Sequence, residues 1–133
     1  MEKTVTFRFK EPLTEDFIDW VTRAVEIFDQ KQHDYGCGNI ARRGDAGILI
    51  RVGDKYERLD NLYGKNLEPA VDDESIDDSW MDMGIYSFMA GMCRAGEWPG
   101  FDPKGEDSPE PLPEYGQRWG PVTRRDSEMA EER

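Results

Sequence analysis

The chain has 133 residues, enough for one domain or for a smaller domain with a tail. Its 17 Lys and Arg residues against 29 Asp and Glu residues give a net charge of −12, which argues against a protein that coats DNA or RNA through a basic surface. No apolar run approaches the roughly 20 residues of a membrane helix, and the N-terminus lacks the apolar region of a signal peptide. Cys37 and Cys93 have no zinc-site spacing. The sequence therefore predicts a cytoplasmic protein.

The N-terminal half of the chain predicts one short strand and two long helices. Residues 4–9 alternate between polar and apolar side chains, as in a short strand, although no second strand follows to pair with it. Apolar residues then recur at helical spacing over 14–33, with Thr14 as the expected N-cap. Residues 39–43 are a candidate short helix. A second long helix is expected over about 46–63, with an apolar stripe made of Leu49, Val52, Tyr56, Leu59 and Tyr63.

The C-terminal half predicts a third long helix followed by a tail. The helix is expected over about 73–95, with Asp72 or Asp73 as its N-cap. Residues 97–133 contain six of the eight prolines and ten acidic residues against five basic ones, so we expect an extended, partly disordered tail. The predicted division is a helical domain over 1–96 and a Pro-rich acidic tail over 97–133. Four aromatic residues in the tail are candidate anchors: Trp98, Phe101, Tyr115 and Trp119.

Together these elements predict an all-α fold, a bundle of three long helices with a short N-terminal strand and an extended C-terminal tail. Residues 83–93 of the third helix are apolar nearly all round and should lie centrally in the core. Three helices leave part of this apolar surface uncovered. We therefore expect dimerisation to complete the bundle.

An acidic cluster at the start of the third helix is the main candidate site. Residues 72–82 hold six acids in eleven positions, and Glu74, Asp78 and Asp82 are spaced i, i+4, i+8, which stacks them on one helix face. The helix dipole accounts for acids in the first turn, but Asp82 lies about two turns in among apolar residues, where a lone charge is costly. Three explanations stand: a solvated acidic face, a salt-bridge partner, or a Mg²⁺ site that bridges to phosphates. The metal site is favoured.

Two smaller clusters accompany it. Asp54 and Arg58 are i, i+4 on the second helix, as in an ordinary surface ion pair, but beside the third helix Asp54 could add an oxygen to a shared cation. The end of the first helix carries Lys31, which suits the helix dipole, and His33, which is most simply a surface or capping residue. Tyr35 follows, placed either to stack on a base or to fill the core.

Three spaced motifs resemble the nucleotide modification associated domain 1 family, whose members are common in bacteriophages. That family is in turn similar to the all-α nucleotide pyrophosphatases of the MazG and dimeric dUTPase type. The resemblance covers about residues 15–95. The motifs are Lys31-x-x-Asp34-Tyr35-Gly36, then Asp54-Lys55-x-x-Arg58-Leu59, then Glu74-x-Ile76-x-Asp78-x-x-x-Asp82-x-x-x-Tyr86.

The resemblance implies a homodimeric nucleotide pyrophosphohydrolase of the cytoplasm, or of the host cytoplasm if a phage encodes it. Its cofactor would be Mg²⁺, with Mn²⁺ as the alternative. Glu74, Asp78 and Asp82 would be catalytic and would hold the metal together with Asp54. The residues that would bind the nucleotide are Lys31, Tyr35, Lys55, Arg58 and Tyr86.

Two other functions stay open at this point. The same cavity could sequester a nucleotide, or a nucleotide-derived immune signal, without turning it over. Alternatively, the net charge of −12 suits an acidic DNA mimic that binds a DNA-binding enzyme. In each case the sequence predicts neither a membrane partner nor general nucleic-acid binding.

Overall fold

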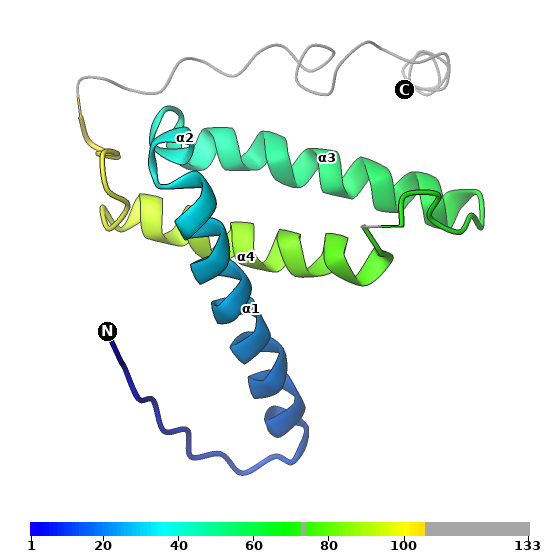
Figure 1. Cartoon of the computed structure of the whole chain (residues 1–133), viewed down its shortest axis with the longest axis horizontal. Coiled ribbons are helices and arrows are strands. Elements are labelled where there is room, and N and C mark those ends of the chain that lie inside the picture. Colours follow the sequence, from blue (N-terminus) through cyan, green and yellow to red (C-terminus); the bar gives the residue numbers. More distant parts are fainter. Residues whose placement is uncertain (73, 106–133) are drawn as a thin grey trace.

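The computed structural model describes residues 1–72 and 74–105, and the fold of this part is predominantly helical (Figure 1). The helices are α1 (Leu13–Tyr35), α2 (Gly38–Ala41), α3 (Gly44–Gly64) and α4 (Ile76–Arg94). The predicted all-α class is therefore confirmed. None of these helices is long and apolar enough to cross a membrane.

The N-terminal segment differs from the expectation. Residues 1–10 have no regular secondary structure, and the described part of the chain contains no β-strand. The short strand predicted at 4–9 is therefore not formed. A strand needs a neighbouring backbone for its ladder of hydrogen bonds, and no neighbouring segment in the described part supplies one.

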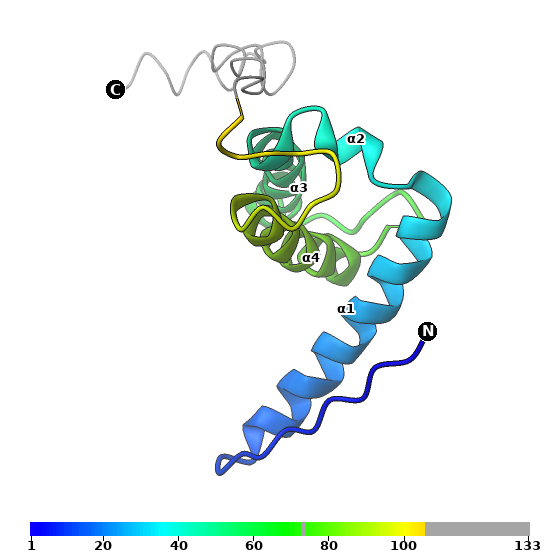
Figure 2. The same cartoon turned by 90° about the vertical axis from the view of Figure 1, so that its left-hand side faces the viewer.

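The three long helices do not form a closed bundle. α3 and α4 lie side by side and antiparallel, joined by the loop over 65–75 (Figure 1). The C-terminal half of α1 packs across this pair through Ala24, Ile27 and Phe28, whereas its N-terminal half projects away (Figure 2). As a result, α1 contains no buried residue.

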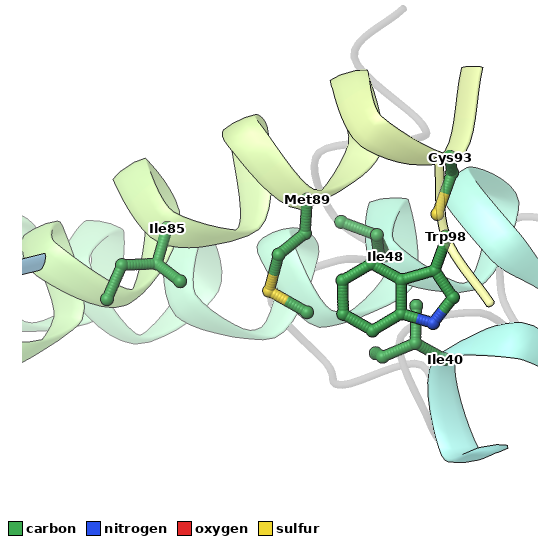
Figure 3. Close-up of a cluster of buried hydrophobic side chains, with 6 residues drawn as sticks. All are labelled: Ile40, Ile48, Ile85, Met89, Cys93 and Trp98. Atoms are coloured by element: carbon green, nitrogen blue, oxygen red, sulfur yellow. The ribbon is translucent and has the colours of Figure 1, made fainter. Parts of the chain in front are cut away.

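The core lies where α2, α3 and α4 meet, and a residue beyond α4 closes it. Trp98 is only 2% exposed. Its indole N–H donates to the Cys37 carbonyl at 3.1 Å, and its ring meets Phe28 edge-on with 6.2 Å between centroids. Trp98 therefore ties α1 and the α1–α2 turn to the end of α4. Figure 3 shows the six side chains of the core: Ile40, Ile48, Ile85, Met89, Cys93 and Trp98.

A second aromatic anchor fixes the start of α3. The Phe101 ring covers Gly44, where a Cβ atom would overlap the ring and where φ is +59°. Glycine satisfies both conditions, since it tolerates positive φ and has no side chain. Trp98 and Phe101 are thus two of the four predicted anchors, and both pack on the helices. The other two, Tyr115 and Trp119, lie outside the described residues.

The buried face of α3 shares only Val52 and Leu59 with the predicted stripe. Leu49, Tyr56 and Tyr63 are each half exposed or more. The least exposed row lies beside them at 4-3-4-3 spacing and consists of Ile48, Val52, Lys55, Leu59 and Leu62. Both rows are largely apolar, so their residue types could not show which one is buried. The buried row also has a lysine, Lys55, at its centre.

The start of α4 also differs from the prediction. Its N-cap is Ser75: the Ser75 Oγ accepts the Asp78 backbone N–H at 3.1 Å, and the Asp78 carboxylate accepts the Ser75 backbone N–H at 2.9 Å. This is a capping box, and its Ser-x-x-Asp pattern was present in the sequence. Glu74 therefore precedes the helix, and the predicted single face of Glu74, Asp78 and Asp82 is not formed.

Trp98→Ala should lower the free energy of unfolding by about 3–5 kcal/mol, because it leaves a large cavity in the core and orphans the Cys37 carbonyl. Urea unfolding measures the loss. The matched control is Trp80→Ala, since Trp80 is 52% exposed and should cost much less. Equal losses in the two variants would mean that Trp98 does not close the core.

Candidate functional site

The four carboxylates predicted to hold a metal lie in different surroundings. Asp78 is exposed and is engaged in the cap of α4, and exposed Asp54 lines a different cavity. Only Glu74 and Asp82 converge, and they do so on a lysine. Within residues 1–72 and 74–105, no group of three or more His, Cys, Asp or Glu side chains is placed to hold a metal ion.

Asp82 is the centre of an ion-pair network between three helices. Its Oδ1 lies 3.0 Å from Lys31 Nζ of α1, and its Oδ2 lies 3.0 Å from Lys55 Nζ of α3. The Asp82 side chain is only 16% exposed. Of the three explanations for this acid, the salt-bridge partner describes what the side chain contacts, and two cations offset its burial.

Lys55 is held by a second carboxylate as well. Its ammonium pairs with Glu74, in the loop just before α4, in addition to Asp82. Burial by itself lowers the pKa of Lys55, but the hydrogen bonds and charges of Glu74 and Asp82 outweigh it, so the pKa is raised above its ordinary value. Lys55 therefore carries its charge throughout the neutral range, and the network loses its stabilising effect only as the pH rises through that raised pKa.

Arg58 has a structural role at the start of α4. Its guanidinium donates to the Ser79 hydroxyl at 2.7 Å, to the Ser75 carbonyl at 3.3 Å, and to the Glu74 carbonyl. Three of its donors are therefore used to hold the loop and the first turn of α4 against α3. The phosphate contact that the resemblance implied for Arg58 has no counterpart in this arrangement.

A cavity of about 240 Å³ opens beside the network, between α1, α3 and α4; we call it the basic cavity. Of the residues that the resemblance implied for nucleotide binding, Lys31, Tyr35, Lys55 and Tyr86 line it. Three cations and one carboxylate face it, so its lining is positively charged although the whole chain is acidic. The charged residues are Lys31, Arg51, Lys55 and Asp82.

Arg51 is the residue that the sequence analysis missed. It is half-buried in the wall of the basic cavity, and in the described part of the chain no carboxylate lies within ion-pair distance of its guanidinium. The sequence did carry a signal, because Arg51, Lys55 and Arg58 follow one another at i, i+4, i+7 on α3. Like charges at this spacing repel, so each cation of the row needs a counter-charge or a dipole.

The other wall of the basic cavity is apolar and aromatic. Phe28, Tyr86 and Met89 are half-buried or buried there, and exposed Tyr35 lies at the edge, where α1 ends. Trp80 of α4 donates its indole N–H to the Tyr63 hydroxyl at 2.8 Å and does not line the cavity. His33 is exposed and outside the cavity, as expected for a surface residue.

In comparisons with protein-family models, with curated proteins and with solved structures, nothing matches the chain. The resemblance to the nucleotide modification associated domain 1 family therefore stays a prediction made from the three motifs. The geometry of the basic cavity is therefore the basis for the function proposed below.

The capping box makes a pH-dependent contribution to stability. Hydrogen bonds from the Ser75 backbone N–H and hydroxyl lower the pKa of Asp78, so its stabilising effect is present above the unfolded-state pKa of about 3.9 and is lost as the pH falls through the lower, folded-state value. Asp78→Asn should therefore cost about 0.3–1 kcal/mol at pH 7, as a carboxylate at a helix N-terminus does. The difference from the parent should vanish in acid.

Thermal unfolding from pH 7 to pH 2 measures this difference. Asp77→Asn is the matched control, because Asp77 is also in the first turn of α4 but is not part of the capping box. A cost for Asp78→Asn that persists unchanged at pH 2 would contradict the role of the charged cap.

Proposed function

We propose that the chain binds a nucleotide in the basic cavity, with the phosphates near Arg51 and Lys55 and the base against the aromatic wall. The observation that supports this is the charge of the cavity: three cations face it in a chain of net charge −12. A phosphate group offers several strong acceptors to such donors, and Arg and Lys are the residues that bind it best.

Within residues 1–72 and 74–105, Arg51 has no carboxylate partner, and this is the most specific feature of the basic cavity. A half-buried guanidinium without a carboxylate is only partly hydrated, so an anionic ligand that supplies the missing counter-charge gains more there than at a fully exposed site. Lys31 is half exposed, and among the described residues it pairs with Asp82 alone, so it can also turn toward a ligand. Tyr35 and Tyr86 provide flat rings at the same cavity.

Hydrolysis of the nucleotide is the second candidate, and the convergence of Glu74 and Asp82 on Lys55 favours it. Mg²⁺ is commonly held by one or two carboxylates together with the phosphates of the substrate. Glu74 and Asp82 are the two residues that fit this pattern, whereas Asp54 and Asp78 do not. When bound, the ion would neutralise phosphate charge and lower the pKa of a bound water.

Lys31→Ala should weaken nucleotide binding about tenfold, because it removes one charge-assisted hydrogen bond worth about 1.5 kcal/mol while Lys55 still pairs with Asp82. Isothermal titration with the mononucleotides and triphosphates of the common bases measures the affinity. Lys65→Ala is the control, since Lys65 is exposed at the end of α3 and outside the cavity. Absence of binding to every nucleotide would refute the proposal.

One incubation separates hydrolysis from sequestration. The protein is held with Mg²⁺ and each nucleotide that it binds, and released phosphate and pyrophosphate are assayed. The protein is then denatured and the bound compound is recovered. Intact ligand and no released phosphate would assign a binding protein for that compound, whereas stoichiometric product would assign an enzyme.

A second part of the proposal concerns the surface that α1 and α4 leave open. A groove of about 260 Å³ between these helices is lined only by apolar side chains; we call it the apolar groove. Phe88 in its wall is 63% exposed, and Phe17 on the projecting half of α1 is 65% exposed. α1 has three further exposed apolar residues, namely Leu13, Trp20 and Val25.

We propose that a second copy of the chain covers this surface. Aromatic side chains can bury about 150–250 Å² each. Phe17, Trp20 and Phe88 are each about half exposed, so together with the apolar groove they offer several hundred Å² of apolar area. That is comparable to the largest apolar patch on a typical monomer, about 300–600 Å² and often functional, and is about half of the ~800 Å² that each partner of a stable dimer buries. A projecting helix without a buried residue also needs a partner to be stable in water.

Phe17→Glu should shift the protein from dimer to monomer, because it places a charge on the exposed apolar side of α1 that the second copy would cover. Size-exclusion chromatography with light scattering measures the mass over a concentration series. Tyr56→Glu is the control, since Tyr56 is equally exposed but lies on α3, away from the apolar groove. A parent protein that stays monomeric at high concentration would contradict the dimer and leave nucleotide binding untouched.

A further inference from the structure

A second cavity, of about 420 Å³, adjoins the basic cavity and shares Asn39, Ile40 and Arg51 with it. Its other walls come from the turn between α2 and α3 and from the first half of α3. Among the residues that line it are Arg42, Ile48 and Asp54. Because Arg51 faces both spaces, the two cavities form one continuous surface with this guanidinium at their junction.

The turn that forms the second cavity is fixed in place. The Phe101 ring packs over Gly44, and the positive φ of Gly44 sets the direction in which the chain enters α3. Arg42 is part of this turn and lines the cavity. Arg42 is exposed, and in the part of the chain that the structure describes no carboxylate pairs with it.

The second cavity is lined by three arginines and one carboxylate, so it can hold a nucleoside together with the phosphate that joins it to a second one; these charged residues are Arg42, Arg43, Arg51 and Asp54. Asp54 faces the cavity, and its carboxylate would repel a phosphate but can accept hydrogen bonds from ribose hydroxyls or base N–H groups. Ile48 contributes apolar surface. The guanidinium of Arg42 is planar, so it can stack on a base as well as bind a phosphate oxygen.

The size of the cavities leads to the same ligand. The basic cavity, at about 240 Å³, is below the range of about 300–1,000 Å³ that is usual for small-molecule sites, the second cavity, at about 420 Å³, is within it, and the two together have room for a ligand that spans both. One nucleoside and its phosphate would fill the first space and leave the second open. A ligand with two nucleosides would occupy both.

From these observations we infer that the ligand is a dinucleotide, two nucleosides joined through phosphate. The phosphate would lie at Arg51, one nucleoside against Tyr35 and Tyr86 in the basic cavity, and the other between Arg42 and Asp54 in the second cavity. This inference rests on the proposed nucleotide-binding function and specifies its substrate class.

The test compares matched ligands by isothermal titration at one salt concentration. The probes are the 5′-mononucleotide, the nucleoside triphosphate and the 3′,5′-linked dinucleotide of each common base. The dinucleotide should bind at least about tenfold more tightly than the mononucleotide of the same base. Arg42→Glu should remove most of this advantage and leave mononucleotide affinity unchanged, because Arg42 does not line the basic cavity.

Two controls keep the result specific. Arg94→Glu makes the same charge change at an exposed position at the end of α4, so any loss that it shares with Arg42→Glu reflects net charge alone. Asp54→Asn tests the second cavity from its other wall and should weaken only the dinucleotide. Because Arg42 is exposed, the melting temperature of the Arg42→Glu variant should equal that of the parent.

Each other outcome overturns the inference in a distinguishable way. If mononucleotides and dinucleotides bind equally, the second cavity is not a subsite, but the proposed function stands. If the triphosphate matches the dinucleotide and depends equally on Arg42, the second cavity holds phosphates and the ligand is a mononucleotide. If no nucleotide binds, both the inference and the proposed function fail.

Discussion

The structure depends on one partly buried carboxylate that is shared between two lysines. Asp82 of α4 accepts Lys31 from α1 and Lys55 from α3, so a single side chain connects the three long helices. This matters most for α1, which has no buried residue of its own and otherwise contacts the core only through partly buried side chains such as Ile27 and Phe28. Ion pairs at a water-exposed surface contribute little, but an acid that is only 16% exposed would be costly without its cations. Asp82 needs two cations to offset its burial, and this need holds α1 in place through Lys31. It also brings Lys31 and Lys55 to the wall of the basic cavity.

In the basic row of α3, two residues are engaged by groups of the protein and one has no acid partner in the described residues. Arg58 is satisfied by carbonyl and hydroxyl groups at the start of α4, and Lys55 by two carboxylates. Arg51, one turn before Lys55, faces two adjoining cavities without an acid partner in the described residues. Along α3, Arg58 and Lys55 are therefore engaged by groups of the protein, whereas Arg51 is the cation that the proposed ligand would contact. Two carboxylates of the acidic cluster over 72–82, Glu74 and Asp82, hold this row in position by pairing with Lys55.

Much of the fold could be predicted from the sequence, because helical periodicity and glycine stops are local properties. The three long helices appear within a few residues of the predicted bounds. The sequence did not predict which side of α3 is buried, nor the tertiary contacts. Two neighbouring rows of α3 are both apolar, and only packing against α4 selects the row that contains Lys55. The burial of Trp98 was likewise invisible, since its partners Phe28 and Cys37 are distant in the chain. For the site, five residues of the motifs line one cavity, namely Lys31, Tyr35, Lys55, Asp82 and Tyr86, and their predicted roles stay predictions. Glu74 and Asp78 do not share that face, because α4 begins only after its N-cap Ser75.

The contrast between an acidic chain and a basic cavity limits which polyanions can enter. At physiological salt, charges more than about 8 Å apart are largely screened, so the acids on the outer surface hardly affect a phosphate that is in contact with Arg51. A long nucleic acid would have to follow the outer surface, where its phosphates meet carboxylates and release few counterions. A compact phosphorylated ligand avoids this cost because its charges lie within the cavity. The negative net charge is therefore compatible with nucleotide binding, and it favours small ligands over polymers of the same chemistry.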